Sequence, residues 1–219
     1  MARPRKPRPL QWGIPVTHSA FKPYVTALGQ LTLAWNELHE RMSLLFCTVM
    51  GGGYANQFLA IWHTINSDRN QRSVLAAAVE NDLNRSNNDA THKYLIDEIR
   101  WICGQVNTLE NLRNDALHSP LIGFGPHITP MTGLGHLRAQ KLESKSDFLA
   151  EFRWCRDAAV ALTEYVYMIN ASLSIGRALP DRPKLPPLDR LRGTGTFTGG
   201  GGTARPAILP PLTGVSRGR

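Results

Sequence analysis

The chain has 219 residues, of which 42% are hydrophobic and 19% charged, a size that holds one domain of about 150 residues with tails. Polar residues interrupt its apolar stretches well before the roughly 20 unbroken apolar positions of a membrane span, and three widely spaced cysteines argue against a disulfide framework or a thiolate zinc cage. The formal net charge of +8 is unevenly distributed, and its distribution divides the chain.

Three parts of different composition follow one another. Residues 1–18 are predicted to be a basic N-terminal arm, because the first ten residues carry four positive and no negative charges, with no apolar run of a secretory signal behind them. Residues 19–176 are predicted to be a folded domain. Residues 177–219, in which 15 of 43 positions are Gly or Pro, are predicted to be a disordered basic tail that attracts phosphate backbones or only solubilises the chain. We therefore expect a cytoplasmic protein with no membrane partner.

Helical periodicity begins near the start of the domain. Apolar residues recur at alternating spacings of four and three from Tyr24 to Val49, which is typical of a helix with one buried face, and three glycines at 51–53 end the segment. A broken helical stretch follows, from Ala55 to about residue 65, and a second start signal stands at Ser67. On the first segment, His39 and Glu40 are expected to be solvated, and Glu37 is expected to pair with Arg41 four residues later.

Two further long helices complete the pattern. One runs from Leu95 to Ala116 and stops before Pro120, and the last runs from Phe148 to Leu173, with Ser146 or Asp147 as its N-cap. Residues 121–145 show no helical stripe and are predicted to be a long loop or a short hairpin. The predicted fold class is therefore all-α, an up-and-down bundle of four to five helices with this insertion before the last long helix.

Arg113 conflicts with the apolar stripe on which it stands. A guanidinium on a buried stripe needs a hydrogen-bond acceptor or a solvent-filled cleft. One interpretation is structural, because Glu110 lies three residues earlier and can pair with Arg113 on the helix surface. The other is that the seam opens here into a phosphate-binding pocket, since a planar guanidinium grips two phosphate oxygens at once.

His118 stands in the last turn of the same helix, where the negative end of the helix dipole favours the imidazolium. The spacing of five residues places it about 140° around the helix from Arg113, so one helix does not aim both side chains at one point. Two copies of the helix paired across a two-fold axis would bring both pairs into one cleft.

The run from Arg113 through Asn114 and Asp115 to His118 resembles the signature of the HEPN superfamily, an arginine and a polar residue followed after four to six positions by a histidine. The looser likeness in helix number and order covers about residues 20–176. The resemblance implies a HEPN-like bundle that acts as a homodimeric, metal-independent endoribonuclease without a cofactor, as in many toxin and antiviral proteins. By this likeness Arg113 would stabilise the transition-state phosphate, His118 would move protons, and Asn114 would orient the site. A separate inhibitory protein would be a possible partner.

These residue types suit RNA cleavage without a metal. The 2′-hydroxyl loses a proton as it attacks phosphorus, the 5′-oxygen gains one, and negative charge builds on the phosphate. The expected products are a 2′,3′-cyclic phosphate and a 5′-hydroxyl. Asp115, Glu110 and His63 are predicted to bind RNA or to support the site, and no metal site is expected.

The alternative hypothesis is a non-catalytic bundle of the same shape that serves as a dimerisation or RNA- or nucleotide-binding module. A second match to the looser signature, from Arg85 to His92, lies in a polar stretch that is expected to be a loop and a helix start.

Overall fold

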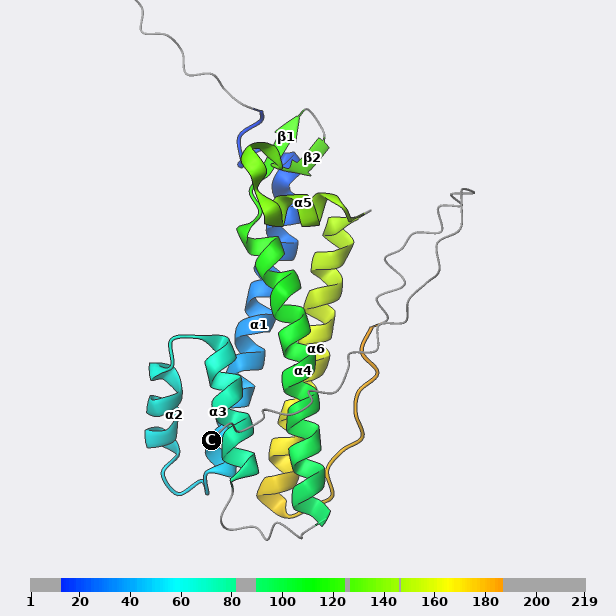
Figure 1. Ribbon diagram of the computed structural model, residues 1–219. Coiled ribbons are helices and arrows are strands. Elements are labelled where there is room, and N and C mark those ends of the chain that lie inside the picture. The colour runs from blue at the N-terminus through cyan, green and yellow to red at the C-terminus, as the bar shows by residue number, and fades with distance from the viewer. Residues whose placement is uncertain (1–12, 82–89, 125–126, 146, 187–219) are drawn as a thin grey trace, which may run out of the picture.

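The computed structural model describes residues 13–81, 90–124, 127–145 and 147–186. Three long helices, α1 (Lys22–Val49), α4 (Ala90–His118) and α6 (Phe148–Ile175), form the body of the molecule (Figure 1). Three shorter helices accompany them, namely α2 (Ala55–Thr64), α3 (Asp68–Glu80) and α5 (Leu137–Glu143). The prediction of an all-α bundle is confirmed at this level.

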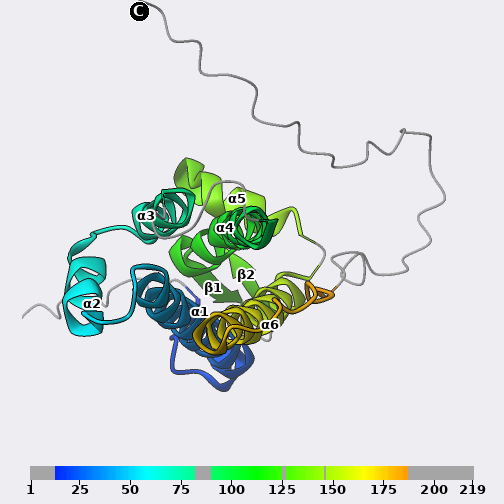
Figure 2. The same ribbon diagram turned by 90° about the horizontal axis from the view of Figure 1, so that it is seen from below.

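The helices alternate in direction along the chain. Tyr24 stacks on Phe148 at the start of α1 and α6, and Arg41 lies over Tyr167 further along both helices, so these two helices run parallel to each other. Helix α4 runs opposite to both and closes the core between them (Figures 1 and 2). Helices α2 and α3 form a second layer beside α1 and α4, and α3 lies along α4 between His92 and Glu110.

The predicted helix boundaries agree with the observed caps. Ser67 accepts a hydrogen bond from the backbone N–H of Asn70 and so begins α3, and Asp147 accepts one from Ala150 and begins α6. Helix α1 ends at Val49 with Met50 as its C-cap, and Gly51 follows with φ of 96°, a left-handed conformation that costs glycine little. The Glu37–Arg41 pair also forms, with 3.5 Å between Oε1 and Nη2.

The insertion between α4 and α6 contains a hairpin and a helix. Strands β1 (Leu121–Phe124) and β2 (His127–Pro130) pair antiparallel, which is the hairpin option of the prediction. Ile14 forms a bridge to Gly123, and a Cβ on that glycine would meet the Ile14 side chain at 2.4 Å, so glycine is needed for this close approach. Helix α5 was not predicted, because its seven residues are too few to show a helical stripe.

Residues 177–186 depart from the predicted disordered tail. They extend along the bundle, and Leu179 and Leu185 pack against its core. The Trp154 indole donates a hydrogen bond to the Pro186 carbonyl at 2.7 Å, and Arg182 pairs with the buried Glu98 at 2.9 Å. The high Gly and Pro content predicted disorder, but packing of Leu179 and Leu185 and the ion pair with the buried Glu98 order this segment. The rest of the predicted tail, residues 187–219, lies outside the described residues.

Helix α6 is long and apolar enough to cross a membrane by length and composition, with a mean hydropathy of 1.2 in its most apolar window. The core helix of a soluble bundle has the same properties, and α6 buries one side between α1 and α4. The expected cytoplasmic location stays a prediction.

Candidate functional site

Arg113 is half-buried on α4 and its guanidinium is held on two sides. The guanidinium carbon lies 5.4 Å from the ring centre of Trp35 on α1, within cation–π range. Its Nη1 donates to the Asn114 side-chain oxygen at 3.0 Å. The Nε atom is buried and makes no hydrogen bond in the described structure. The side chain is therefore fixed in place while part of its donor capacity stays unused.

Trp35 connects Arg113 to the start of α3. Its side chain is 1% exposed, and the indole N–H donates to Asp68 Oδ2 at 2.8 Å. The imidazole ring of His39, one turn further along α1, lies 5.0 Å from the indole ring. Three helices thus meet around one tryptophan.

Arg72 is the most deeply buried charged residue of this region, with 2% of its surface exposed. It donates two hydrogen bonds to Asn107 Oδ1, at 3.0 and 2.7 Å, and one to Glu110 Oε2 at 2.7 Å. Arg69 also reaches Glu110 Oε2, at 3.3 Å. Glu110 therefore pairs through Oε2 with two arginines of α3, and the structural interpretation in which it pairs with Arg113 is wrong, because the carboxylate is directed to α3.

We call the seven side chains that meet here the arginine cluster. They come from α1, α3 and α4, and they are Trp35, His39, Asp68, Arg69, Arg72, Glu110 and Arg113.

His39 is buried, and the expectation that it is solvated is wrong. Its Nδ1 lies 3.3 Å from Gln71 Oε1, and its Nε2 lies 3.4 Å from Arg72 Nη1. Burial lowers the pKa of His39 below its ordinary value, and the charge of Arg72 lowers it further, against an opposing effect of Asp68. The imidazole is therefore held neutral at physiological pH.

His118 is the last residue of α4 and is exposed. None of the described residues holds its side chain by a hydrogen bond or an ion pair. The next residue, Ser119, is buried, and its hydroxyl has no partner among the described atoms. Asn114 and His118 are four residues apart and so share one face of α4, whereas Arg113 is turned inward onto Trp35.

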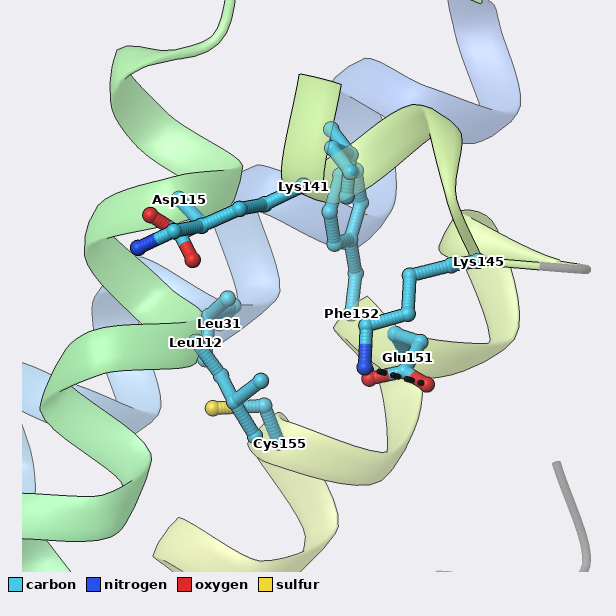
Figure 3. A pocket seen from close by; sticks show the side chains of 9 residues that line it. Leu31, Leu112, Asp115, Lys141, Lys145, Glu151, Phe152 and Cys155 are labelled. Carbon is cyan, nitrogen blue, oxygen red and sulfur yellow. Dashed lines mark ion pairs between the residues drawn. The ribbon is translucent and has the colours of Figure 1, made fainter. Parts of the chain in front are cut away.

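Asp115 lies on another side of α4 from Arg113, because residues two positions apart do not face each other on a helix. It lines a cavity of about 20 Å³ between α4, α5 and α6, together with Lys141 and Cys155 (Figure 3). A cavity of this size holds about one water molecule. The Lys145–Glu151 ion pair at 3.7 Å flanks it. Asp115 is therefore not brought together with the arginine cluster.

His63 is also separate from the cluster. It is exposed on α2, and its Nε2 lies 4.0 Å from Glu40 Oε2. The residue before it, Trp62, is buried and packs on Phe46, so α2 turns Trp62 inward and His63 outward. Of the three predicted supporting residues, only Glu110 joins the cluster.

The sequence patterns did not identify Arg72 or Trp35 as members of the site. A signal for Arg72 was present, because the buried positions of α3 are Arg72, Leu75 and Val79, which repeat at three and four residues. A guanidinium on an apolar stripe therefore marks both α3 and α4.

Other reactive groups lie elsewhere. Burial raises the pKa of Cys155 to about 12 and that of Cys103 to about 11, so both thiols stay protonated and are poor nucleophiles. His136 caps α5 and His127 is exposed on β2. The part of the chain that the structure describes contains no group of three metal-ligating side chains. Arg85, of the second signature match, lies outside the described residues, while His92 is buried and its Nε2 lies 2.8 Å from the Val79 carbonyl oxygen.

Comparisons with protein-family models, with curated proteins and with solved structures find nothing that matches this chain significantly.

Proposed function

We propose that this protein is a metal-independent endoribonuclease with a HEPN-like bundle, in which Arg113, Asn114 and His118 form the active site. One observation carries the proposal. Arg113 occupies the seam of α4, is fixed by Trp35 and Asn114, keeps a buried Nε without a partner, and stands five residues before an exposed histidine at the helix end. A guanidinium held in place on the same helix as an exposed imidazole suits phosphoryl transfer when a second copy of α4 completes the cleft.

Each residue has a defined chemical task in this proposal. An imidazole takes the proton of the 2′-hydroxyl while the 2′-oxygen bonds to phosphorus. The bond from phosphorus to the 5′-oxygen then breaks, and an imidazolium gives that oxygen a proton. Arg113 stabilises the negative charge that collects on the non-bridging oxygens, and Asn114 holds the guanidinium in orientation through the 3.0 Å hydrogen bond. The products are a 2′,3′-cyclic phosphate and a 5′-hydroxyl.

A homodimer supplies the second proton carrier. One chain has one His118, and the reaction needs a proton acceptor and a proton donor at the same time. If the C-terminal turns of two α4 helices face each other across a two-fold axis, each cleft contains an imidazole from each subunit. A toxin or antiviral role in the cytoplasm, restrained by a separate inhibitory protein, is part of the same proposal.

A non-catalytic RNA-binding module is the second candidate. It is favoured by the surroundings of His118, because no described side chain orients this imidazole, whereas catalytic histidines are usually held by a hydrogen bond. In this case the same arginines bind RNA and no bond is cleaved.

The test is incubation of the full chain with total RNA in EDTA, followed by analysis of the fragment ends. We expect cyclic-phosphate ends from the parent and a loss of at least about 100-fold in rate for His118→Ala, because a general acid–base group contributes roughly that much. His127→Ala, which removes another exposed histidine, is the matched control and should cleave like the parent. DNA should remain intact, since it lacks the 2′-hydroxyl.

Two outcomes would contradict the nuclease. Equal cleavage by the parent and by His118→Ala would show that this histidine is not the proton carrier. Absence of cleavage in all three proteins, each folded and each retaining RNA, would favour the binding module.

A further inference from the structure

The arginine cluster carries more positive than negative charge. Three guanidinium groups, those of Arg69, Arg72 and Arg113, are collected around two carboxylates, those of Asp68 and Glu110. The fourth ionisable base, His39, is kept neutral by burial. Guanidinium groups stay protonated in proteins, so the excess cannot be relieved by loss of a proton. A partly buried cluster with one uncompensated cation is a place where an anion binds favourably.

Two of the three arginines have donors to spare. Arg72 donates from Nε and Nη2 to Asn107 and Glu110, and its Nη1 lies 3.4 Å from His39 Nε2 in the buried interior. Arg69 is 65% exposed, and a single 3.3 Å contact to Glu110 Oε2 ties it to the cluster, on an oxygen that already accepts from Arg72. Arg113 has an unpartnered Nε. The donors that solvent can reach therefore lie mainly on Arg69, because the unpartnered Nε of Arg113 is buried.

Arg69 lies at one end of a row of α4 side chains that leads to the proposed active site. Glu110, Asn114 and His118 follow one another at intervals of four residues and so form a single row on the surface of α4. This row rises by about 12 Å along the helix axis. Arg69 is attached to the first residue of the row, and His118 is the last. A strand of nucleic acid that lies along the row meets Arg69 before it reaches the histidine.

We propose that Arg69 binds a backbone phosphate of RNA next to the phosphate that Arg113 and His118 engage, with Glu110 as the residue that orients it. The proposal rests on the proposed function for the identity of the polymer. Arg72 is a positioning residue in this arrangement, because it holds Glu110 from the buried side and touches no substrate. The proposal adds a second phosphate contact, and this contact lies on α3. The sequence signature lies on α4 alone.

A binding experiment on a protein that cannot cleave separates this inference from the nuclease proposal. The full chain with His118→Ala is titrated against a fluorescent single-stranded RNA at several salt concentrations, with and without Arg69→Gln. We expect Arg69→Gln to weaken binding by about 5- to 10-fold, and to reduce the slope of log K against log salt by about 0.7, as expected for one lost contact to a single strand.

Arg100→Gln provides the matched control. Arg100 is 61% exposed on α4 and pairs with Glu80 at 2.9 Å, so its exposure and its single carboxylate partner resemble those of Arg69. It contacts the C-terminal end of α3, whereas Arg69 stands at the N-terminal end of that helix. We expect its loss to change RNA affinity by less than about 2-fold, a non-specific charge effect. Equal losses for Arg69→Gln and Arg100→Gln, or no loss for Arg69→Gln in a folded protein, would overturn the proposal.

Two further measurements test whether Arg69 contacts phosphate. A DNA strand of the same sequence should lose affinity by the same factor upon Arg69→Gln, because the contact is to phosphate, and a loss confined to RNA would show a sugar contact instead. In a chain with His118 intact, Arg69→Gln should raise KM and leave kcat within about 2-fold. If the parent does not cleave, the nuclease proposal fails, and the binding titration still decides whether Arg69 holds phosphate.

Discussion

Two clusters on α4 are built from the same kinds of residue. In the arginine cluster, Arg113 lies 5.4 Å from the ring of Trp35. Trp101 lies about three turns before Arg113 on α4. Arg182 of the extended segment lies 5.3 Å from the ring centre of Trp101. We call this second group, Glu98, Trp101, Tyr165 and Arg182, the strap cluster. Each cluster also contains one α4 carboxylate, Glu110 or Glu98, that pairs with an arginine of another segment.

The clusters differ in charge balance. Glu98, 1% exposed, receives the Tyr165 hydroxyl at 2.6 Å and Arg182 Nε at 2.9 and 3.2 Å, so one carboxylate meets one guanidinium. Burial, together with the hydrogen bond to Glu98, raises the pKa of Tyr165 above its ordinary value, and the phenol stays a donor. The strap cluster is therefore complete without a ligand. The arginine cluster keeps one excess cation and an unpartnered donor, which is why we assign binding to it and a structural role to the other.

The largest expected effect is on the stability of the arginine cluster. Arg72→Met removes a fully buried guanidinium and leaves the Glu110 carboxylate and Asn107 without their main donor. Breaking one side of a buried ion pair costs about 3 kcal/mol or more. Urea unfolding should show this loss of free energy with an unchanged m-value.

The double variant Arg72→Met with Glu110→Leu separates the charge effect from simple loss of volume. Removing both partners of a buried pair is often close to neutral, so this protein should recover most of the lost stability. If the double variant is as unstable as Arg72→Met, packing and not the unpaired carboxylate explains the loss, and the contrast between the clusters no longer rests on charge.

A smaller effect is expected for the strap cluster. Arg182→Ala leaves the buried Glu98 with the Tyr165 hydroxyl, so the carboxylate keeps one of its donors. We expect a loss of about 1–2 kcal/mol in urea unfolding and faster proteolysis within residues 177–186. Arg177→Ala, on the same segment but with an exposed side chain, should change neither. RNA binding should be unaffected by Arg182→Ala, and a reduced affinity would show that the strap cluster also serves the ligand.

Local periodicity and caps were sufficient to predict the long helices and the positions of α2 and α3, but not helix α5 or the extended segment 177–186. The stripe from Tyr24 to Val49 and the caps at Ser67 and Asp147 mark four of the observed helix ends within a few residues. Helix α5 is shorter than two periods of a stripe. The segment 177–186 depends on contacts with Trp154 and Glu98, which are distant in sequence, so composition alone predicted disorder.

The contacts of the candidate site were also only partly predictable from local sequence. Arg113 was identified because a guanidinium interrupts an apolar stripe, and the structure places that side chain on a buried ring. The structural interpretation, in which Glu110 pairs with Arg113, was wrong, since spacing along one helix cannot show that α3 brings Arg69 and Arg72 to the same carboxylate. His39 was misjudged for the same reason, because its burial is caused by α3 and not by its own helix.

The smallest effect is a dependence of stability on pH that arises from the arginine cluster. His39 is a base whose pKa is lower in the folded chain than its ordinary value of 6.5, because burial disfavours the imidazolium and Arg72 and Arg113 repel it, against the attraction of Asp68 and the hydrogen bond to Gln71. As pH falls through 6.5, the unfolded chain takes up a proton that the folded chain refuses. The free energy of unfolding is therefore fully retained above that pH and decreases below it, down to the folded-state pKa. His39→Gln cannot take up this proton, so urea unfolding at neutral and mildly acidic pH should show a smaller decrease for the variant than for the parent. Equal decreases in both would mean that burial does not hold His39 neutral in the folded chain, and the charge count on which the comparison of the two clusters depends would then have to include a protonated His39.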